Sequence, residues 1–386
     1  MGIPIEYSER LKKLPPYLFA DIEKKIAEKK KAGVDIISLG IGDPDIPTPE
    51  PIRKKLSEEA FAPNTHNYSL SQGEEEFREA VAEWYKKRFG VSLDPKKEVI
   101  ALIGSKEGLA NIARAFVNPK DVVLVPDPAY PVYAQGATTL CDGVPVKFPL
   151  LEENDFLPVL DSLDAKNAKM MYLNYPNNPT GAVATREFLK EAVHFAEEKG
   201  IILCYDNAYS EFTFDDYIAP SALEFGMDCI EFHSCSKTFS MTGDRIGFAV
   251  GNADIVEGLR KVKTQIDSGP SVYVQRAAIA ALNSYKGKER PPFVNEIMLE
   301  YERRRDVFVR GLNKIGLKCK KPKATFYIWL RVRGSSVDFV NKLLDVGVVA
   351  TPGIGFGEYG EGFVRFALTQ PIERIKEALE RMEKAV

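Results

Sequence analysis

Between residues 98 and 251 the chain alternates short apolar segments with segments of helical character. This alternation limits the fold more than any other feature of the sequence. The apolar segments are short, uninterrupted and rich in β-branched and aromatic residues, which favours strands buried on both faces. These segments are residues 98–104, 122–127, 170–176, 201–209, 229–236 and 246–251. Strands that alternate with helices form a mostly parallel sheet covered by helices on both faces, so we predict an α/β fold with a large domain at residues 47–285.

The helical segment at residues 185–200 carries its apolar residues on one stripe and stops at Gly200. After about residue 285 the pattern changes to that of an α+β domain. We expect helices at 291–316 and 337–347, strands at 324–332, 348–353 and 362–369, and a last helix with Pro371 in its first turn. The N-terminal residues, with a helix at 18–33, should pack there too. We therefore predict a smaller α+β domain made of residues 1–46 and 286–386.

Composition excludes several classes of function. A chain of 386 residues exceeds one ordinary core, which agrees with two domains. The net charge of −3, with acids and bases interspersed, argues against nucleic acid or membrane as a partner. The apolar runs are too short to span a bilayer, and the first residues lack a signal-peptide core. Five cysteines without CxxC spacing and three scattered histidines predict no disulfide, no metal site and a cytoplasmic location.

Polar residues gather where the predicted strands end. Parallel strands place their carboxyl ends at one edge of the sheet, where ligands of such folds bind. Each of these residues alone could be a turn, a helix cap, an ion pair or a surface lysine. Together they suit a ligand with a phosphate, a phenolic oxygen, a ring nitrogen and an aldehyde, the phosphate lying at the start of the helix after the first strand. The residues are Ser105, Lys106, Asn178, Asp206, Tyr209, Ser234, Ser236 and Lys237.

Residues 234–248, SCSKTFSMTGDRIGF, are similar to the S-x-S-K-x-x-x-M-x-G-x-R-x-G signature of one enzyme family. This family is the fold-type I class I/II aminotransferases, which depend on pyridoxal 5′-phosphate (PLP). The segments NYPNNPTG, YDNAY and FVRF agree with the family in order and spacing, and the resemblance covers essentially the whole chain. The resemblance implies that Lys237 forms an imine with PLP and that an amino group moves between an amino acid and a 2-oxo acid. The lysine must be neutral to react, which burial and nearby cations favour.

The resemblance also assigns the remaining cofactor contacts. It implies that Ser234 and Arg245 hold the phosphate, that Ser105 and Lys106 complete the phosphate site, and that Ser236 contacts the cofactor too. Further contacts are implied for the ring: Asp206 at its nitrogen, Tyr209 and Asn178 at its phenolic oxygen, and Tyr130 stacked on its face. An acid beside the ring nitrogen keeps it protonated, so that the ring can take up electrons from the substrate.

Substrate contacts and assembly follow from the same resemblance. Arg365 would grip the substrate α-carboxylate with its planar fork, although a solvent-facing arginine on an edge strand is the alternative interpretation. Gly42 would let its backbone approach the same carboxylate, because any side chain would intrude there. Tyr68 resembles a tyrosine that reaches the phosphate of the other subunit, which implies a homodimer with shared sites.

Within the family, the segments PPYLFADIEKK, LGIGDPDIPTP and GSKEG resemble LL-diaminopimelate aminotransferases. This implies substrate contacts from Tyr17, Lys106, Tyr130 and Asn178, with LL-2,6-diaminopimelate and 2-oxoglutarate as substrates in lysine biosynthesis. Ser71 stands where plant-type members carry a glutamate, so an aspartate/alanine-type or broad-specificity aminotransferase and a PLP C–S lyase stay open. A PLP-binding regulator without turnover would need an added helix-turn-helix, for which we expect no room before residue 17.

Overall fold

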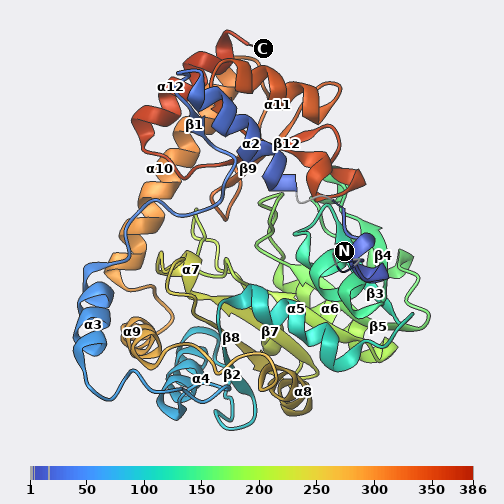
Figure 1. The fold of residues 1–386 in the computed structure, drawn as a ribbon, viewed down its shortest axis with the longest axis vertical. Helices are drawn as coiled ribbons and strands as arrows, with labels where there is room; N and C mark the ends of the chain where they lie inside the picture. The colour runs from blue at the N-terminus through green and yellow to red at the C-terminus, as the bar shows by residue number, and fades with distance from the viewer. Residues whose placement is uncertain (1–2, 4, 16–17, 386) are drawn as a thin grey trace.

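The structure, a computed structural model, describes residues 3, 5–15 and 18–385, and of residues 18–23 it describes the backbone only. Figure 1 shows a large sheet with its helices in the lower part of the molecule and two small sheets with their helices in the upper part. The short helix α7, Cys235–Thr238, lies in the middle, on the side of the large sheet that faces the upper part. This position is where the predicted site residues belong.

The large sheet has seven strands in the order β2-β8-β7-β6-β5-β3-β4. They are β2 Val99–Leu102, β3 Val122–Asp127, β4 Val144–Pro149, β5 Ala168–Asn174, β6 Ile202–Asp206, β7 Cys229–Ser234 and β8 Gly247–Gly251. All neighbouring pairs are parallel except those of β8, which runs antiparallel to β7 and β2. The predicted mostly parallel sheet is confirmed. Sequence analysis missed β4, because this edge strand is partly exposed and lacks a continuous apolar run.

Helices cover both faces of this sheet, as predicted. One face packs against α4 Glu75–Phe89, α6 Arg186–Lys199 and α9 Val272–Asn283, with α3 Glu50–Phe61 lying beside α9. The other face packs against α5 Ser105–Phe116, α8 Ala253–Lys263 and a π-helix at Val132–Thr138. Successive strand residues alternate between the two cores, as Cys204 and Tyr205 do in β6. The predicted apolar stripe of α6 is buried, and Gly200 ends that helix with a φ of +64°.

The upper part contains a three-stranded antiparallel sheet and a two-stranded parallel one. The first has the order β11 Thr351–Pro352, β12 Phe363–Ala367, β9 Tyr327–Arg331, and the second pairs β1 Ile37–Ser38 with β10 Val348–Val349. The helices are α2 Leu18–Lys31, α10 Pro292–Lys314, α11 Ser336–Asp345 and α12 Ile372–Glu383. The short helix α1 Glu9–Lys12 lies instead beside β4 of the large sheet, where Arg10 forms an ion pair with Asp142 at 3.4 Å (Figure 1). N-terminal residues do contact the C-terminal part, as in the ion pair of Lys29 with Asp345 at 2.9 Å. The exact division at residues 46 and 285 stays a prediction.

Two local predictions in this part are wrong. The single strand expected at 348–353 is two strands, because residues 348–349 pair with β1 while residues 351–352 pair with β12. Pro371 is not inside the last helix but precedes it as the N-cap residue. Both differences concern boundaries that depend on the partner strand or on the chain turning into the helix.

The reversed direction of β8 decides which residues meet at the upper edge of the large sheet. In register, Gly247 at the start of β8 lies between Leu102 at the end of β2 and Ser234 at the end of β7. Residues that follow β2 and β7 therefore lie beside residues that precede β8. Asp206 at the end of β6 in turn pairs with Asn174 at the end of β5. One edge thus collects side chains from five strands.

Candidate active site

A cavity of about 350 Å³ opens at this edge, between the large sheet and the three-stranded sheet. It includes every predicted site residue that the structure describes, apart from Tyr68. The predicted residues on its wall are Gly42, Ser105, Lys106, Tyr130, Asn178, Asp206, Tyr209, Ser234, Ser236, Lys237, Arg245 and Arg365. Tyr17 lies outside the described residues. Tyr68 lies on the surface, between α3 and α4, and is 93% exposed.

Lys237 lies in α7, directly after β7. Ser234 caps this short helix, because its side-chain oxygen accepts a hydrogen bond from the backbone N–H of Ser236 at 3.2 Å. The Lys237 Nζ donates to the carbonyl oxygen of Gly42 at 2.9 Å. Burial, with contributions from Arg365 and Arg245, lowers the pKa of Lys237 to about 8 against the opposing effect of Asp43. A substantial fraction of this amine is therefore neutral near pH 8.

One end of the cavity is rich in positive charge and N–H donors. Gly104 precedes α5 with a φ of +92°, and the free first N–H groups of that helix begin at Ser105. A Cβ atom on Gly104 would come within 2.5 Å of Nη2 of Arg245, so glycine is required for this guanidinium to lie against the turn. Arg245 itself has a φ of +54°, a costly conformation for a residue with a side chain. This end suits an anionic group.

Arg245 also contacts the two segments that flank this turn. Its Nη1 donates to the carbonyl oxygen of Thr242 at 2.7 Å, and its Nη2 donates to that of Ile103 at 3.3 Å. These bonds direct the guanidinium toward the start of α5, where Ser105 and Lys106 also line the cavity. The arginine from before β8 thus joins the residues that follow β2.

Another part of the cavity carries a buried carboxylate. Asp206 is 5% exposed, and its Oδ2 accepts a hydrogen bond from the Tyr133 hydroxyl at 2.6 Å. Its Oδ1 accepts the backbone N–H of Ala208 at 3.2 Å. Burial raises the pKa of Asp206 to about 6, although both hydrogen bonds oppose this effect. The carboxylate is therefore ionised at neutral pH and suits a ligand atom that carries a proton.

Arg365 lies on β12, the middle strand of the three-stranded sheet, and is 2% exposed. The interpretation of Arg365 as a solvent-facing arginine on an edge strand is therefore wrong. Its Nη1 donates to Oδ1 of Asn178 at 2.8 Å, and its Nη2 donates to the carbonyl oxygen of Gly40 at 2.8 Å. Its guanidinium also lies 4.3 Å from the ring centre of Tyr327 and 4.6 Å from that of Phe356. These contacts hold the planar fork at the cavity wall.

Sequence reasoning missed several residues of the wall. Tyr327 is the most consequential of them. Its hydroxyl oxygen lies 3.0 Å from that of Tyr209. A Cβ atom on Gly42 would lie 2.1 Å from the hydroxyl oxygen of Tyr327. Asn174 joins two strand ends, because its Oδ1 accepts from the Asn178 N–H and its Nδ2 donates to the carbonyl oxygen of Asp206, each at 2.8 Å. Further missed residues are Ile41, Asp43, Ala208, Thr242 and Phe356.

One of these wall residues, Tyr327, had a visible signal in the sequence, and so did Tyr133, which donates a hydrogen bond to Asp206. Tyr133 is the second tyrosine of the segment PDPAYPVY, and Tyr327 lies in the aromatic strand ATFYIWLRV. Tyr130, from the first of these segments, lies on the cavity wall with the ammonium of Lys106 at 6.0 Å from its ring centre.

In the described ranges no helix is long and apolar enough to cross a bilayer. Among the same residues no group of histidine, cysteine, aspartate or glutamate side chains could hold a metal ion.

The fold and the cavity define an α/β enzyme whose site combines a lysine of lowered pKa, an anion-binding end and a buried carboxylate. The family model described as aminotransferase class I and II matches residues 34–382. An LL-diaminopimelate aminotransferase of Desulforudis audaxviator is 51% identical over 384 residues, which cover 97% of this chain and 96% of the relative. One of Aquifex aeolicus is 51% identical over 387 residues, with 98% of each chain covered. The chain belongs to the class I and II aminotransferases and is a PLP-dependent aminotransferase.

A solved structure supports the same assignment. The substrate-bound structure of BacF from Bacillus subtilis superimposes with a TM-score of 0.92 at 37% identity, covering 99% of this chain and 98% of that one. The chemistry of the cavity fits PLP as well. Gly104 leaves the turn before α5 open to Arg245, which suits a phosphate, and the ionised Asp206 suits a protonated ring nitrogen. Lys237, an amine of lowered pKa, suits an aldehyde.

Proposed function

We propose that the protein transfers the amino group of LL-2,6-diaminopimelate to 2-oxoglutarate, a reaction of lysine biosynthesis whose other product gives tetrahydrodipicolinate. The observation that carries transamination is that Lys237 and the buried fork of Arg365 line one cavity. The choice of diaminopimelate is supported by the names of the two relatives at 51% identity and by the resemblance of GSKEG and the N-terminal segments to that group.

The cavity residues would hold PLP at three of its groups. Arg245, Ser234 and the start of α5 at Ser105 and Lys106 would bind the phosphate, with Ser236 nearby. Other residues would contact the ring: Asp206 at its nitrogen, Asn178 and Tyr209 at its phenolic oxygen, and Tyr130 at its face. When bound, PLP supplies an aldehyde carbon that takes the amino group and a ring that takes up the electron pair left at the substrate α-carbon.

Lys237 would be the residue that moves the proton. Its lowered pKa would leave part of the amine neutral, and a neutral amine could hold the cofactor through its aldehyde and could also accept the proton from the substrate α-carbon. The hydrogen bond from Nζ to the carbonyl oxygen of Gly42 would steady the amine on the side of the cavity where the substrate enters. Asp206, ionised above about pH 6, would hold the proton on the ring nitrogen throughout.

Arg365 would bind the substrate α-carboxylate. Its fork is already oriented by Asn178, by the carbonyl oxygen of Gly40 and by the ring of Tyr327, so little freedom is lost when the carboxylate binds. Gly42 would keep space open for the carboxylate, because a Cβ atom there meets Tyr327. At the other end of diaminopimelate, Lys106 would pair with the distal carboxylate, and Tyr17 and Tyr130 would offer hydroxyls.

The active unit would be a homodimer. Tyr68 is 93% exposed although it is a large aromatic residue, which is the position needed to reach a partner subunit's phosphate site. Ser71 lies in the same loop and donates to the carbonyl oxygen of Asp267 at 3.1 Å.

The five cysteines are all free thiols, which supports the cytoplasm as the location.

A panel of amino donors with 2-oxoglutarate tests the substrate. The purified protein is loaded with PLP, and glutamate formation is measured for LL-diaminopimelate, meso-diaminopimelate, aspartate and alanine. We expect the highest kcat/KM for the LL isomer and little turnover of the meso isomer. Strong turnover of aspartate or alanine with none of LL-diaminopimelate would overturn the substrate and leave the transaminase in place.

A further inference from the structure

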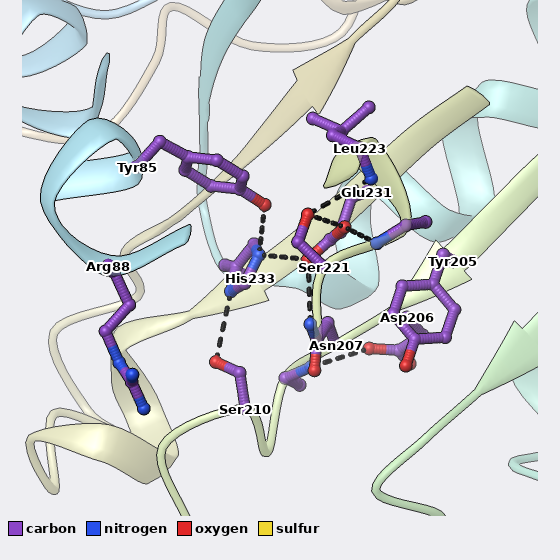
Figure 2. A network of polar contacts seen from close by, with 12 residues as sticks. Tyr85, Arg88, Tyr205, Asp206, Asn207, Ser210, Ser221, Leu223, Glu231 and His233 are labelled. Carbon is purple, nitrogen blue, oxygen red and sulfur yellow. Dashed lines mark hydrogen bonds and ion pairs between the residues drawn. The ribbon is translucent and has the colours of Figure 1, made fainter. Parts of the chain in front are cut away.

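A buried polar cluster lies under the large sheet, on the face opposite to the Asp206 side chain. Figure 2 shows its members pointing toward one another: Glu231 and His233 from β7, Tyr85 from α4, and Asn207 and Ser221 from the loops beside them. Glu231 is 0% exposed and His233 is 3% exposed. No contact that we assign to the cofactor or the substrate involves this cluster, so its place in an apolar core needs another explanation.

Glu231 is the centre of the cluster and accepts four hydrogen bonds. Its Oε1 accepts from Nδ2 of Asn207 at 2.7 Å and from Nε2 of His233 at 2.8 Å. Its Oε2 accepts from the hydroxyl of Ser221 at 2.7 Å and from the N–H of Ala222 at 2.9 Å. Burial alone would raise the pKa of Glu231, but the bonds from His233, Asn207 and Ser221 lower it. A fully satisfied carboxylate at this depth is a rigid anchor, yet adds little net stability over apolar packing.

The anchor holds the turn that supplies three cavity residues, Asp206, Ala208 and Tyr209. Side chains alternate along β6, so Asp206 points to one face of the sheet and the next residue, Asn207, points to the other, where Glu231 lies. Asn207 also donates through its backbone N–H to the carbonyl oxygen of Phe232 at 2.9 Å. The turn closes with the N–H of Ser210 donating to the carbonyl oxygen of Asn207 at 3.0 Å.

His233 contacts the far end of the same turn. Its Nδ1 lies 3.4 Å from the hydroxyl oxygen of Ser210, while its Nε2 lies 2.6 Å from the hydroxyl oxygen of Tyr85. The ring of His233 is also stacked on Phe248, with 5.0 Å between the ring centres. The turn from Asp206 to Ser210, which also carries Tyr209, is thus held from behind at both of its ends.

We propose that Glu231 and His233 are positioning residues, which hold the turn of residues 206–210 from behind and so fix Asp206 and Tyr209 against the cofactor. This inference rests on the roles proposed above for those two residues. A hydrogen bond to the ring nitrogen depends steeply on distance and angle, so a small shift of the Asp206 carboxylate weakens its hold on the ring proton. A cluster that only stabilised the core would have no such effect.

Two variants separate positioning from stability. Asn207→Ala removes the bond to Glu231 and a second bond, from Nδ2 to the carbonyl oxygen of Pro220 at 3.3 Å. Ser221→Ala, the matched control, removes a bond to Glu231 of the same length and a second bond, accepted from the N–H of Leu223 at 3.2 Å. Only Asn207 belongs to the turn. Ser210→Ala is a milder third variant that removes the contact with His233.

The experiment uses the full-length protein reconstituted with PLP. It measures the urea midpoint of unfolding, the dissociation constant of PLP, and the pH midpoint of the visible absorbance band of the bound cofactor. We expect similar losses of stability in Asn207→Ala and Ser221→Ala. Asn207→Ala alone should weaken PLP binding about tenfold. It alone should also move the pH midpoint of the absorbance band upward, because a ring nitrogen that holds its proton less firmly withdraws less electron density. Ser210→Ala should move the midpoint in the same direction by less.

The outcomes distinguish this inference from the proposed function. The positioning role would be overturned if Asn207→Ala and Ser221→Ala had the same dissociation constant for PLP and the same absorbance midpoint. This holds whether or not the shared values differ from those of the unmodified protein. If Asn207→Ala does not fold, an absorbance midpoint in Ser210→Ala identical to that of the unmodified protein would overturn it instead. An unmodified protein that binds no PLP would refute the proposed function, and that result is visible before any variant is made.

Discussion

Asp206→Asn should stabilise the cofactor-free protein above pH 6 while it removes most of the turnover. Burial raises the pKa of Asp206 from 3.8 to about 6, so ionising this carboxyl costs free energy in the folded protein only. The difference of about two between these pKa values corresponds to about 3 kcal/mol. Asparagine keeps the shape of the side chain, and its amide oxygen can still accept the N–H of Ala208. Its amide nitrogen cannot accept the hydrogen bond from the Tyr133 hydroxyl, and the loss of this bond costs about 1 kcal/mol of stability. The net gain is about 2 kcal/mol at pH 8.

The sign of this effect changes with pH. Below about pH 4 the carboxyl is protonated in both the folded and the unfolded protein, so only the lost hydrogen bond counts and the variant is the less stable of the two. The cost of ionisation grows as the pH rises from about 4 to about 6 and is complete above that. Urea unfolding of both cofactor-free proteins at pH 4.5, 6 and 8 measures the difference. A difference that does not vary with pH, or a variant less stable at pH 8, would refute the reasoning.

Four further substitutions test the other parts of the site. Arg245→Met should weaken PLP binding by about 1.5–3 kcal/mol, the size of a charge-assisted hydrogen bond. Arg365→Lys should keep PLP and raise the KM of the amino acid, because one ammonium cannot reproduce the fork. Equal losses of PLP affinity in the two variants would show that Arg365 is assigned to the wrong ligand. Gly42→Ala places a Cβ atom 2.1 Å from the Tyr327 hydroxyl and should cost about 1–3 kcal/mol in thermal unfolding, with a higher KM for every amino acid. Lys106→Ala should lower kcat/KM for LL-diaminopimelate more than for glutamate, and an equal loss for both would remove Lys106 from the distal site.

The sequence was sufficient for most of the large sheet because its strands are buried on both faces. Such strands read as continuous apolar runs, and a polar residue at the end of a run, such as Asp206 or Lys237, is then conspicuous. Arg245 could be placed only through the resemblance, because the direction of β8 is not visible in the chain. The same applies to Arg365, whose burial depends on β12 being the middle strand of its sheet.

Other parts of the site depend on contacts between distant segments. Tyr327 reaches the cavity because β9 pairs with β12, and the aromatic strand alone does not tell which of its side chains faces Arg365. The strand CIEFHSCS was predicted, but its glutamate and histidine have no visible partners until Tyr85 and Asn207 are brought beside them. The edge strand β4 was missed because its burial is partial, so neither a continuous nor an alternating apolar pattern forms.

The central claim is that Lys237 is the residue that bonds the cofactor, and borohydride reduction of the PLP-loaded protein tests it most directly. Reduction makes the bond between lysine and cofactor permanent, and peptide mapping then identifies the lysine. The account predicts a yellow protein with the label on Lys237, and a Lys237→Ala variant that still binds PLP through its phosphate contacts but takes up no label and loses turnover almost entirely. Label recovered on Lys106 at the start of α5, or on Lys263, which is buried and paired with Glu107 and Asp267, would contradict it.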